Sequence, residues 1–170
     1  YYFTTIALSL VISGVAFYII VGRLATDWAS GLLAGSVLVL SKAFVDYSTS
    51  GLENALTHLL LALFLWIFLC RQVTLRTLFW LSMLTAAGAV NRLDSVLLFA
   101  PPLLYMAFLL RGQWLRALGV LALGMAPLLA WEIFSVVYYG FPLPNTFYAK
   151  LNTGLPLWAQ LQQGIFYLLH

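Results

Sequence analysis

The chain has 170 residues, of which 64% are hydrophobic and only 8% are charged. Soluble globular domains carry about 25% charged residues, so this composition excludes an ordinary soluble domain. The net charge of +3 arises from eight Lys and Arg, which lie in short links between apolar runs. Nucleic-acid-binding surfaces need clustered basic side chains, so we expect no nucleic-acid partner. Long continuous apolar runs predict an all-α, polytopic transmembrane helix bundle.

About six spans are expected, followed by a partial or amphipathic helix at the C-terminus. The expected ranges are Tyr2–Gly22, Ala29–Phe44, Asn54–Cys70, Thr77–Val90, Ser95–Leu110 and Ala117–Tyr138, with Leu155–His170 as the last helix. The sequence shows no internal repeat or low-complexity linker, so it predicts a single transmembrane domain over residues 1–170. The first residue is not Met and the last lies in an apolar segment, which is expected of a fragment of a longer membrane protein.

The charged residues predict an orientation for these spans. If the spans alternate, one side receives Arg23, Arg71, Arg76, Arg111 and Arg116, and the other receives Lys42, Arg92 and Lys150. The larger basic group is expected on the cytoplasmic side. The same alternation places Asp46, Glu53 and Asp94 outside and Asp27 inside. Three polar segments, at 46–53, 91–94 and 142–150, are therefore predicted to meet at the outer face.

Several of these residues have an ordinary structural interpretation beside a functional one. Ser50-Gly51-Leu52-Glu53 matches a capping box, in which Ser50 caps the next helix and Glu53 bonds back to it. Glu53 facing a polar cavity is the alternative. Arg92 and Asp94 either pair with each other or line a ligand site, and the guanidinium fork of Arg92 matches phosphate oxygens. Lys150 either adds a second cation or snorkels to the interface.

Two polar residues fall inside apolar spans. Glu132 is either functional or a neutral acid bonded to a neighbouring helix. His58 is expected to be a packed, hydrogen-bonded group, since no second histidine follows at metal-ligand spacing. The sequence therefore predicts no metal site.

Three motifs follow one another along the chain. They are Ser-Gly-Leu-Glu at 50–53 before a helix, Arg92-x-Asp94 after the next helix, and Tyr-Gly-Phe-Pro-Leu-Pro-Asn-Thr-Phe-Tyr-Ala-Lys at 139–150 after a long span. In this order they resemble the middle of bacterial integral-membrane glycosyltransferases of the C-type (GT-C) superfamily, most closely the arabinofuranosyltransferase-like branch. The resemblance covers residues 43–150, and Ser95 stands where the family often has glycine after the Arg-x-Asp motif.

The resemblance implies transfer of a sugar from a polyprenyl-phosphate donor to an acceptor at the outer face of the membrane. It implies substrate binding by Arg92, Asp94, Asn145, Tyr148 and Lys150. The catalytic base of this family is an Asp in the first outer loop, and no such motif is identifiable here. That base is expected upstream of Tyr1, which would leave this piece inactive alone. Within the chain, the candidates for a catalytic carboxylate are Asp46 and Glu53.

The expected partners are membrane lipid, the polyprenyl-phosphate sugar, and a glycan, lipid or protein acceptor. The lipid-linked sugar is a substrate, and no cofactor is expected. The expected location is the bacterial cytoplasmic (inner) membrane of the cell envelope, with a multi-pass chain and the motif loops outside. The alternative is a transporter or flippase segment for a lipid-linked or anionic substrate, and a non-catalytic scaffold is a third. Charges gathered at one rim and the lack of a repeat favour the enzyme.

Overall fold

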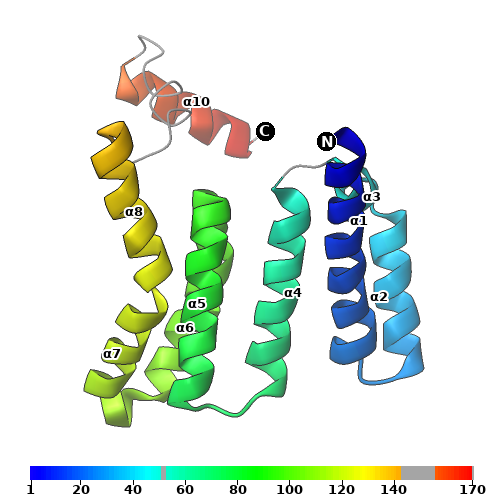
Figure 1. The fold of residues 1–170 in the computed structure, drawn as a ribbon, viewed down its shortest axis with the longest axis horizontal. Helices are drawn as coiled ribbons and strands as arrows, with labels where there is room; N and C mark the ends of the chain where they lie inside the picture. Colours follow the sequence, from blue (N-terminus) through cyan, green and yellow to red (C-terminus); the bar gives the residue numbers. More distant parts are fainter. Residues whose placement is uncertain (51–52, 143–155, 170) are drawn as a thin grey trace. The chain divides into compact units, whose positions relative to one another are not determined.

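The computed structural model describes residues 1–50, 53–142 and 156–169, and every regular element in this part of the chain is a helix (Figure 1). The all-helical class predicted from the sequence is confirmed. The chain divides into two compact units, Tyr1–Leu129 and Ala130–His170. A single transmembrane domain stays a prediction.

Helices and short helical turns follow one another along both units. In chain order they are α1 (Tyr2–Ile19), the π-helical turn η1 (Ile20–Leu24), α2 (Trp28–Leu40), α3 (Lys42–Ser48), α4 (Asn54–Cys70), α5 (Leu75–Asn91), the 3₁₀ turn η2 (Leu93–Ser95), α6 (Val96–Leu109), the 3₁₀ turn η3 (Arg111–Gln113), α7 (Trp114–Gly124), α8 (Ala126–Tyr139) and α10 (Leu157–Leu169). The predicted third span has the same bounds as α4, and α5 is longer than the predicted fourth span by two residues at its start and one at its end.

Among the described residues, one helix is long and apolar enough to cross a membrane by itself. Helix α1 continues through η1 as Tyr2–Leu24, 23 residues long, and this candidate span agrees with the first predicted one except for two more residues at its end. Two sharply bent pairs, α2 with α3 and η2–α6 with η3–α7, raise the number to three if each pair is one span. Helices α4 and α8 are apolar but shorter than 18 residues. About six spans therefore stays a prediction.

The predicted span Ala29–Phe44 is wrong as one continuous helix, because the chain breaks at Ser41. Helix α2 ends at Leu40, and α3 leaves at an angle of 70° to it. The Ser41 hydroxyl accepts a hydrogen bond from the Phe44 amide at 3.4 Å and so caps α3. Serine is among the preferred N-cap residues, because its oxygen satisfies a free amide of the first turn.

The predicted span Ala117–Tyr138 is also interrupted, at Met125 between α7 and α8. Pro127 follows this break and has no N–H to donate to the carbonyl four residues earlier. In the first turn of α8 that missing donor has no cost, because first-turn amides lack helical partners. Helix α7 also begins earlier than predicted, so Arg116 lies inside it.

Helix α5 is central to the first unit, since it contacts α4, α6 and α7. Their shared core consists of Leu60, Phe64, Leu78, Leu81, Phe99, Leu103, Met106 and Ala117. Helix α1 packs on α4 through a second cluster that includes Ala16, Ile19 and Ala62. Small side chains such as these two alanines allow helices to approach closely.

Large apolar side chains also cover the outside of this unit. Val11, Leu97 and Leu104 are 64%, 79% and 65% exposed. Contiguous apolar surface of this kind is rare on soluble monomers and matches contact with lipid. Together with α1, the outer surface supports a membrane protein.

Candidate substrate-binding site

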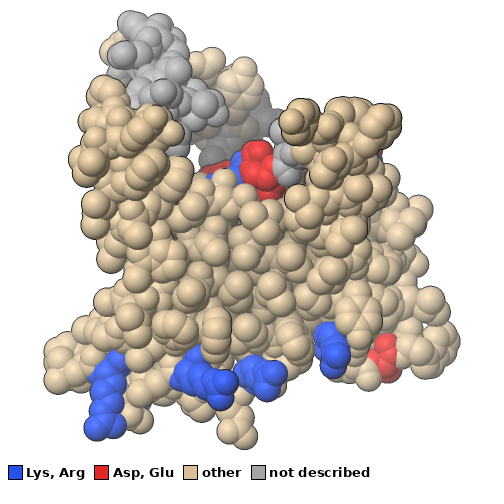
Figure 2. All heavy atoms as spheres, viewed as in Figure 1, with Lys and Arg blue, Asp and Glu red and all other residues tan. Residues whose placement is uncertain are grey.

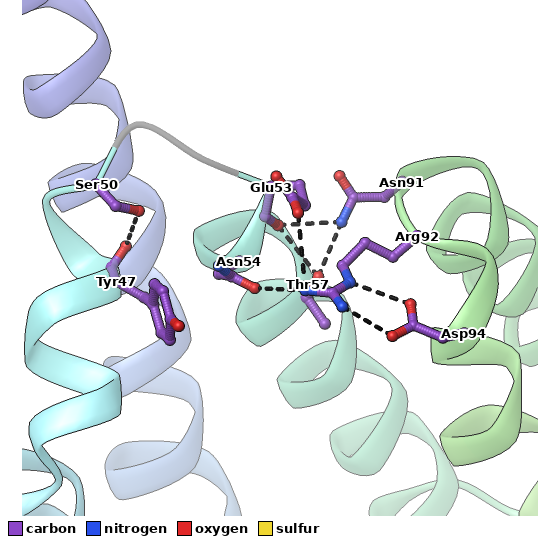
Figure 3. Close-up of polar contacts among 8 residues, drawn as sticks. All are labelled: Tyr47, Ser50, Glu53, Asn54, Thr57, Asn91, Arg92 and Asp94. Carbon is purple, nitrogen blue, oxygen red and sulfur yellow. Dashed lines mark hydrogen bonds and ion pairs between the residues drawn. The ribbon is translucent and has the colours of Figure 1, made fainter. Parts of the chain in front are cut away.

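Polar side chains from two antiparallel helices and a turn meet where α4 begins and α5 ends (Figure 3). We refer to Glu53, Asn54, Thr57, Asn91, Arg92 and Asp94 as the polar cluster. Glu53, Arg92 and Asp94 were predicted as site residues, whereas the other three were not. Their positions in the first turn of one helix and the last turn of the next were the signal that could have identified them.

Asn91 joins the end of α5 to the start of α4. Its side-chain amide donates to the Glu53 carbonyl at 3.1 Å and to the Thr57 hydroxyl at 2.9 Å. The Thr57 hydroxyl donates in turn to the Glu53 carbonyl at 3.1 Å. Both amide hydrogens of Asn91 therefore hold the two helix ends together, and they fix the backbone on which Glu53 and Arg92 stand.

Arg92 directs its guanidinium at three acceptors. Its Nε and Nη2 donate to the two carboxylate oxygens of Asp94 at 3.1 and 2.8 Å. Its Nη1 donates to Asn54 Oδ1 at 3.0 Å and lies 3.7 Å from a carboxylate oxygen of Glu53. A bidentate pair of this kind combines charge with fixed geometry. The predicted Arg92–Asp94 pair is thus present, and Asn54 holds the remaining arm of the fork.

The ion pair also fixes the protonation states of its members. The hydrogen bonds from Arg92 are the main cause that lowers the pKa of the Asp94 carboxyl below its ordinary value. The same contact raises the pKa of the Arg92 guanidinium. Both groups are therefore ionised at neutral pH.

The polar cluster carries more negative than positive charge. Arg92 stands against the carboxylates of Glu53 and Asp94, which gives a net charge of 1 − 2 = −1. The three side chains are 38%, 44% and 64% exposed in that order, so a ligand can reach them. A guanidinium has five N–H groups, and two remain after the three hydrogen bonds above. The arrangement suits a hydroxyl-rich ligand, with acceptors for its hydroxyls and a shared cation for an anionic group.

The predicted capping box at Ser50 is wrong. Helix α4 begins at Asn54 with Glu53 in the N-cap position, and the Ser50 hydroxyl donates to the Tyr47 carbonyl at 3.0 Å (Figure 3). The Glu53 side chain makes no capping hydrogen bond to α4. Its carboxylate instead lies beside Arg92, which corresponds to the alternative role in a polar site.

The other candidate for a catalytic carboxylate lies in a different environment. Asp46 pairs with Lys42 one turn earlier on α3. Their side chains are 53% and 85% exposed. Of the two candidates, Glu53 belongs to the polar cluster and Asp46 forms a separate surface pair.

Three further predicted site residues, Asn145, Tyr148 and Lys150, lie outside the described residues, and their roles stay predictions. The start of their motif is described. Gly140 has a φ of 77°, a conformation open to glycine without strain, and it ends α8. The Ser135 hydroxyl donates to the Phe141 carbonyl at 2.9 Å and fixes the chain that leaves the helix.

The opposite end of the first unit is basic. Figure 2 shows Lys and Arg side chains gathered along the lower edge of the molecule. The arginines of this end are Arg23, Arg71, Arg76, Arg111 and Arg116, at the ends of η1, α4 and α6 and the starts of α5 and α7. Asp27 is at the same end, where the Ser30 amide donates to its carboxylate at 2.7 Å and lowers its pKa. Five arginines and one aspartate give a net charge of 5 − 1 = +4, so the predicted separation of charge is present.

The two polar residues of the apolar spans do not join the polar cluster through any described contact. His58 packs its ring against Phe44, with centroids 5.1 Å apart, and its buried Nδ1 has no hydrogen-bond partner among the described residues. Glu132 is half-buried on α8, in the second unit. Over the same part of the chain, no three His, Cys, Asp or Glu residues come together as a possible metal site.

Comparison with known proteins gives one point of similarity. The chain is 33% identical over 122 residues to a terminal beta-(1->2)-arabinofuranosyltransferase of Mycobacterium tuberculosis. The match covers 68% of this chain and 19% of the relative, so the chain spans about a fifth of the length of that protein. No family model matches the chain, and no solved structure does. The chain is thus similar to part of a glycosyltransferase, and this similarity supports its assignment to the transferases.

Proposed function

We propose that the chain is part of a membrane glycosyltransferase that moves a sugar from a polyprenyl-phosphate donor to an acceptor at the outer face of the membrane. The observation that carries this proposal is the 33% identity over 122 residues to an arabinofuranosyltransferase. The polar cluster supports it, because carboxylate, amide and guanidinium groups converge at one end of a unit built of apolar helices.

The proposed reaction is a direct displacement at the anomeric carbon. The acceptor hydroxyl oxygen forms the new bond, its proton passes to a carboxylate, and the bond from carbon to phosphate oxygen breaks. The electron pair of that bond stays on the polyprenyl phosphate. Glu53 is the better placed of the two candidate carboxylates, because it lies beside Arg92 and is free of a helix cap.

Arg92 would bind the leaving phosphate in this proposal. Its two remaining N–H groups can donate to phosphate oxygens while Nε and Nη2 keep their bonds to Asp94. Because the described cluster has a net charge of −1, a further cation is needed to favour a phosphate. Lys150 is the residue that we propose for this role.

Sugar transfer by the full-length protein tests the proposal. Arg92→Ala is expected to lower the rate of transfer from a polyprenyl-phosphate sugar by roughly 10²- to 10³-fold, as for loss of one preorganised donor to a developing anion. Arg92→Lys is expected to recover only a small part, because an ammonium group cannot pair with two carboxylate oxygens in the same plane. Arg116→Ala, at the basic end, is the matched control and is expected to transfer normally. Unchanged transfer by Arg92→Ala would refute the assignment.

A further inference from the structure

A pocket at the basic end of the first unit has no part in the proposed reaction. It lies at the hairpin of α4 and α5 and has a volume of about 580 Å³. Arg71 and Arg76 line it together with the indole rings of Trp66 and Trp80. Within residues 1–50, 53–142 and 156–169, neither arginine forms an ion pair. Two unneutralised cations on one pocket wall point to an anionic ligand.

The loop that carries these arginines is held by hydrogen bonds of its own. The Thr77 hydroxyl donates to the Gln72 carbonyl at 2.7 Å, and the Thr77 amide donates to the Thr74 hydroxyl at 3.1 Å. Thr74 is the N-cap of α5. These hydrogen bonds join the loop to the start of α5. Arg71 at the end of α4 and Arg76 in the first turn of α5 therefore belong to a hairpin with a fixed backbone. Ligand binding therefore costs little conformational entropy for ordering the loop backbone.

Trp66, which lines the pocket, also contacts a third guanidinium, that of Arg23. The Cζ of Arg71 lies 5.7 Å from the centroid of the Trp66 ring, and that of Arg23 lies 5.8 Å from it. An indole attracts cations over its face, so both guanidiniums are held close to a ring that lines the pocket. The acid at this end, Asp27, is engaged as the N-cap of α2 and lines a different groove, between α1 and α2. The field in the pocket is therefore positive.

The walls of the pocket favour a lipid over a soluble anion. Trp80, which lines the pocket, is 45% exposed, and Leu69, the residue before the lining Cys70 on α4, is 65% exposed, so both helices of the hairpin expose large apolar side chains near the basic rim. Indole side chains concentrate at the level of lipid headgroups, and basic pockets between membrane helices bind anionic headgroups. A soluble phosphate would contact only the arginines, whereas acyl chains would also cover the apolar surface. We propose that this pocket binds the phosphate of an anionic phospholipid.

Lipid binding to the full-length protein in detergent tests this proposal. The protein is titrated with phosphatidylglycerol or with phosphatidylcholine, and bound lipid is counted by native mass spectrometry. We expect stronger binding of phosphatidylglycerol, with roughly fivefold weaker binding on Arg71→Gln or Arg76→Gln and roughly 25-fold on the double variant. Arg116→Gln removes an arginine of the same end outside the pocket and is expected to bind as the wild type does. Thermal unfolding of each variant shows that it is folded.

Three outcomes would overturn the proposal. The first is equal binding of both lipids by the wild type, and the second is full phosphatidylglycerol binding by a folded double variant. The third is displacement of phosphatidylglycerol by inorganic phosphate at millimolar concentration, which would make the pocket a site for a soluble anion. Sugar transfer by the double variant separates this test from the proposed function, because normal transfer with lost lipid binding leaves the reaction assigned to Arg92 intact.

Discussion

The two ends of the first unit use arginine in opposite ways. At the polar cluster, Arg92 is held by Asp94, Asn54 and Glu53, and the described group has a net charge of −1. At the basic end, Arg71 and Arg76 have no described carboxylate partner and line an open pocket. An arginine fixed by two carboxylates can orient a ligand without attracting every anion. Arginines without carboxylate partners attract anions more strongly, but they hold a bound anion in a less defined orientation. The difference is what we expect of a reaction site on one side and a lipid contact on the other.

Of the substitutions that separate the two ends, Gly88→Ala is expected to cause the largest loss of stability. A Cβ at this position would lie 2.6 Å from the Phe99 ring and 3.1 Å from the Ser95 hydroxyl. Phe99 is fully buried, so the contact can be relieved only by shifting α6 and the η2 turn that carries Asp94. We expect a loss of about 1–3 kcal/mol in the free energy of unfolding, as for an overpacked core.

The same variant is expected to lower sugar transfer while lipid binding at the α4–α5 hairpin persists. Denaturant unfolding in detergent gives the stability, and Gly119→Ala is the control, because nothing lies within 4 Å of a Cβ at that position. Equal stability of the two alanine variants would mean that Gly88 does not set the packing of η2.

A smaller effect is expected from Asn91→Ala. The change removes the two hydrogen bonds that join α5 to α4 at the polar cluster, and we expect a loss of about 1–2 kcal/mol in stability. Transfer should fall as well, because Glu53 and Arg92 lose their fixed spacing. Gln113→Ala at the opposite end removes one weak contact to Arg116 at 3.5 Å and serves as the control. Thermal unfolding and the transfer assay compare the two variants, and a neutral Asn91→Ala would show that the cluster is held by other contacts.

The smallest effect is expected from Asp94→Asn and depends on pH. Arg92 lowers the pKa of Asp94 in the folded state, so the pair stabilises the fold above the unfolded carboxyl pKa of about 3.9. This stabilisation is lost as the pH falls through the lowered folded-state pKa. Its size should stay below about 1 kcal/mol, because the Asp94 side chain is 64% exposed and solvent screens the pair.

Asp27→Asn gives the matching test at the basic end. The pKa of Asp27 is lowered mainly by a backbone amide rather than by a cation, and asparagine caps helices as well as aspartate does. Thermal unfolding at neutral pH in low and high salt should show a salt-sensitive deficit for Asp94→Asn and none for Asp27→Asn. The same salt response in both variants would contradict the different origins of the two lowered pKa values.

The sequence predicts the apolar helices better than the places where they break. The bounds of α4 were predicted because a continuous apolar run lies between polar links, at Glu53 and at Arg71. The breaks at Ser41 and Met125 were missed, because one cap serine or one proline hardly changes the hydrophobicity of a window. In both cases the local residue type gives the physical reason afterwards.

The polar cluster was predictable only in part. Charge alternation placed Glu53, Arg92 and Asp94 on one side, and the structure brings all three together. The amides of Asn54 and Asn91 act across two helices, through contacts 38 residues apart in the chain. Their positions at helix ends could have marked these residues as candidates, but no periodicity or spacing specifies which residue each of them contacts. The basic pocket was missed for the same reason, since its indoles and arginines become neighbours only when α4 and α5 pack.

The central claim is that the polar cluster faces outward and the basic end faces the cytoplasm. Cysteine labelling in intact cells with a membrane-impermeant maleimide tests it directly. The native Cys70 is exposed and lies next to Arg71 at the basic end, and Thr49 is exposed at the other end in front of Glu53. We predict that Thr49→Cys in a Cys70→Ser background is labelled in intact cells, whereas the native Cys70 is labelled only after permeabilisation. Labelling of Cys70 in intact cells, with Thr49→Cys protected, would contradict the account.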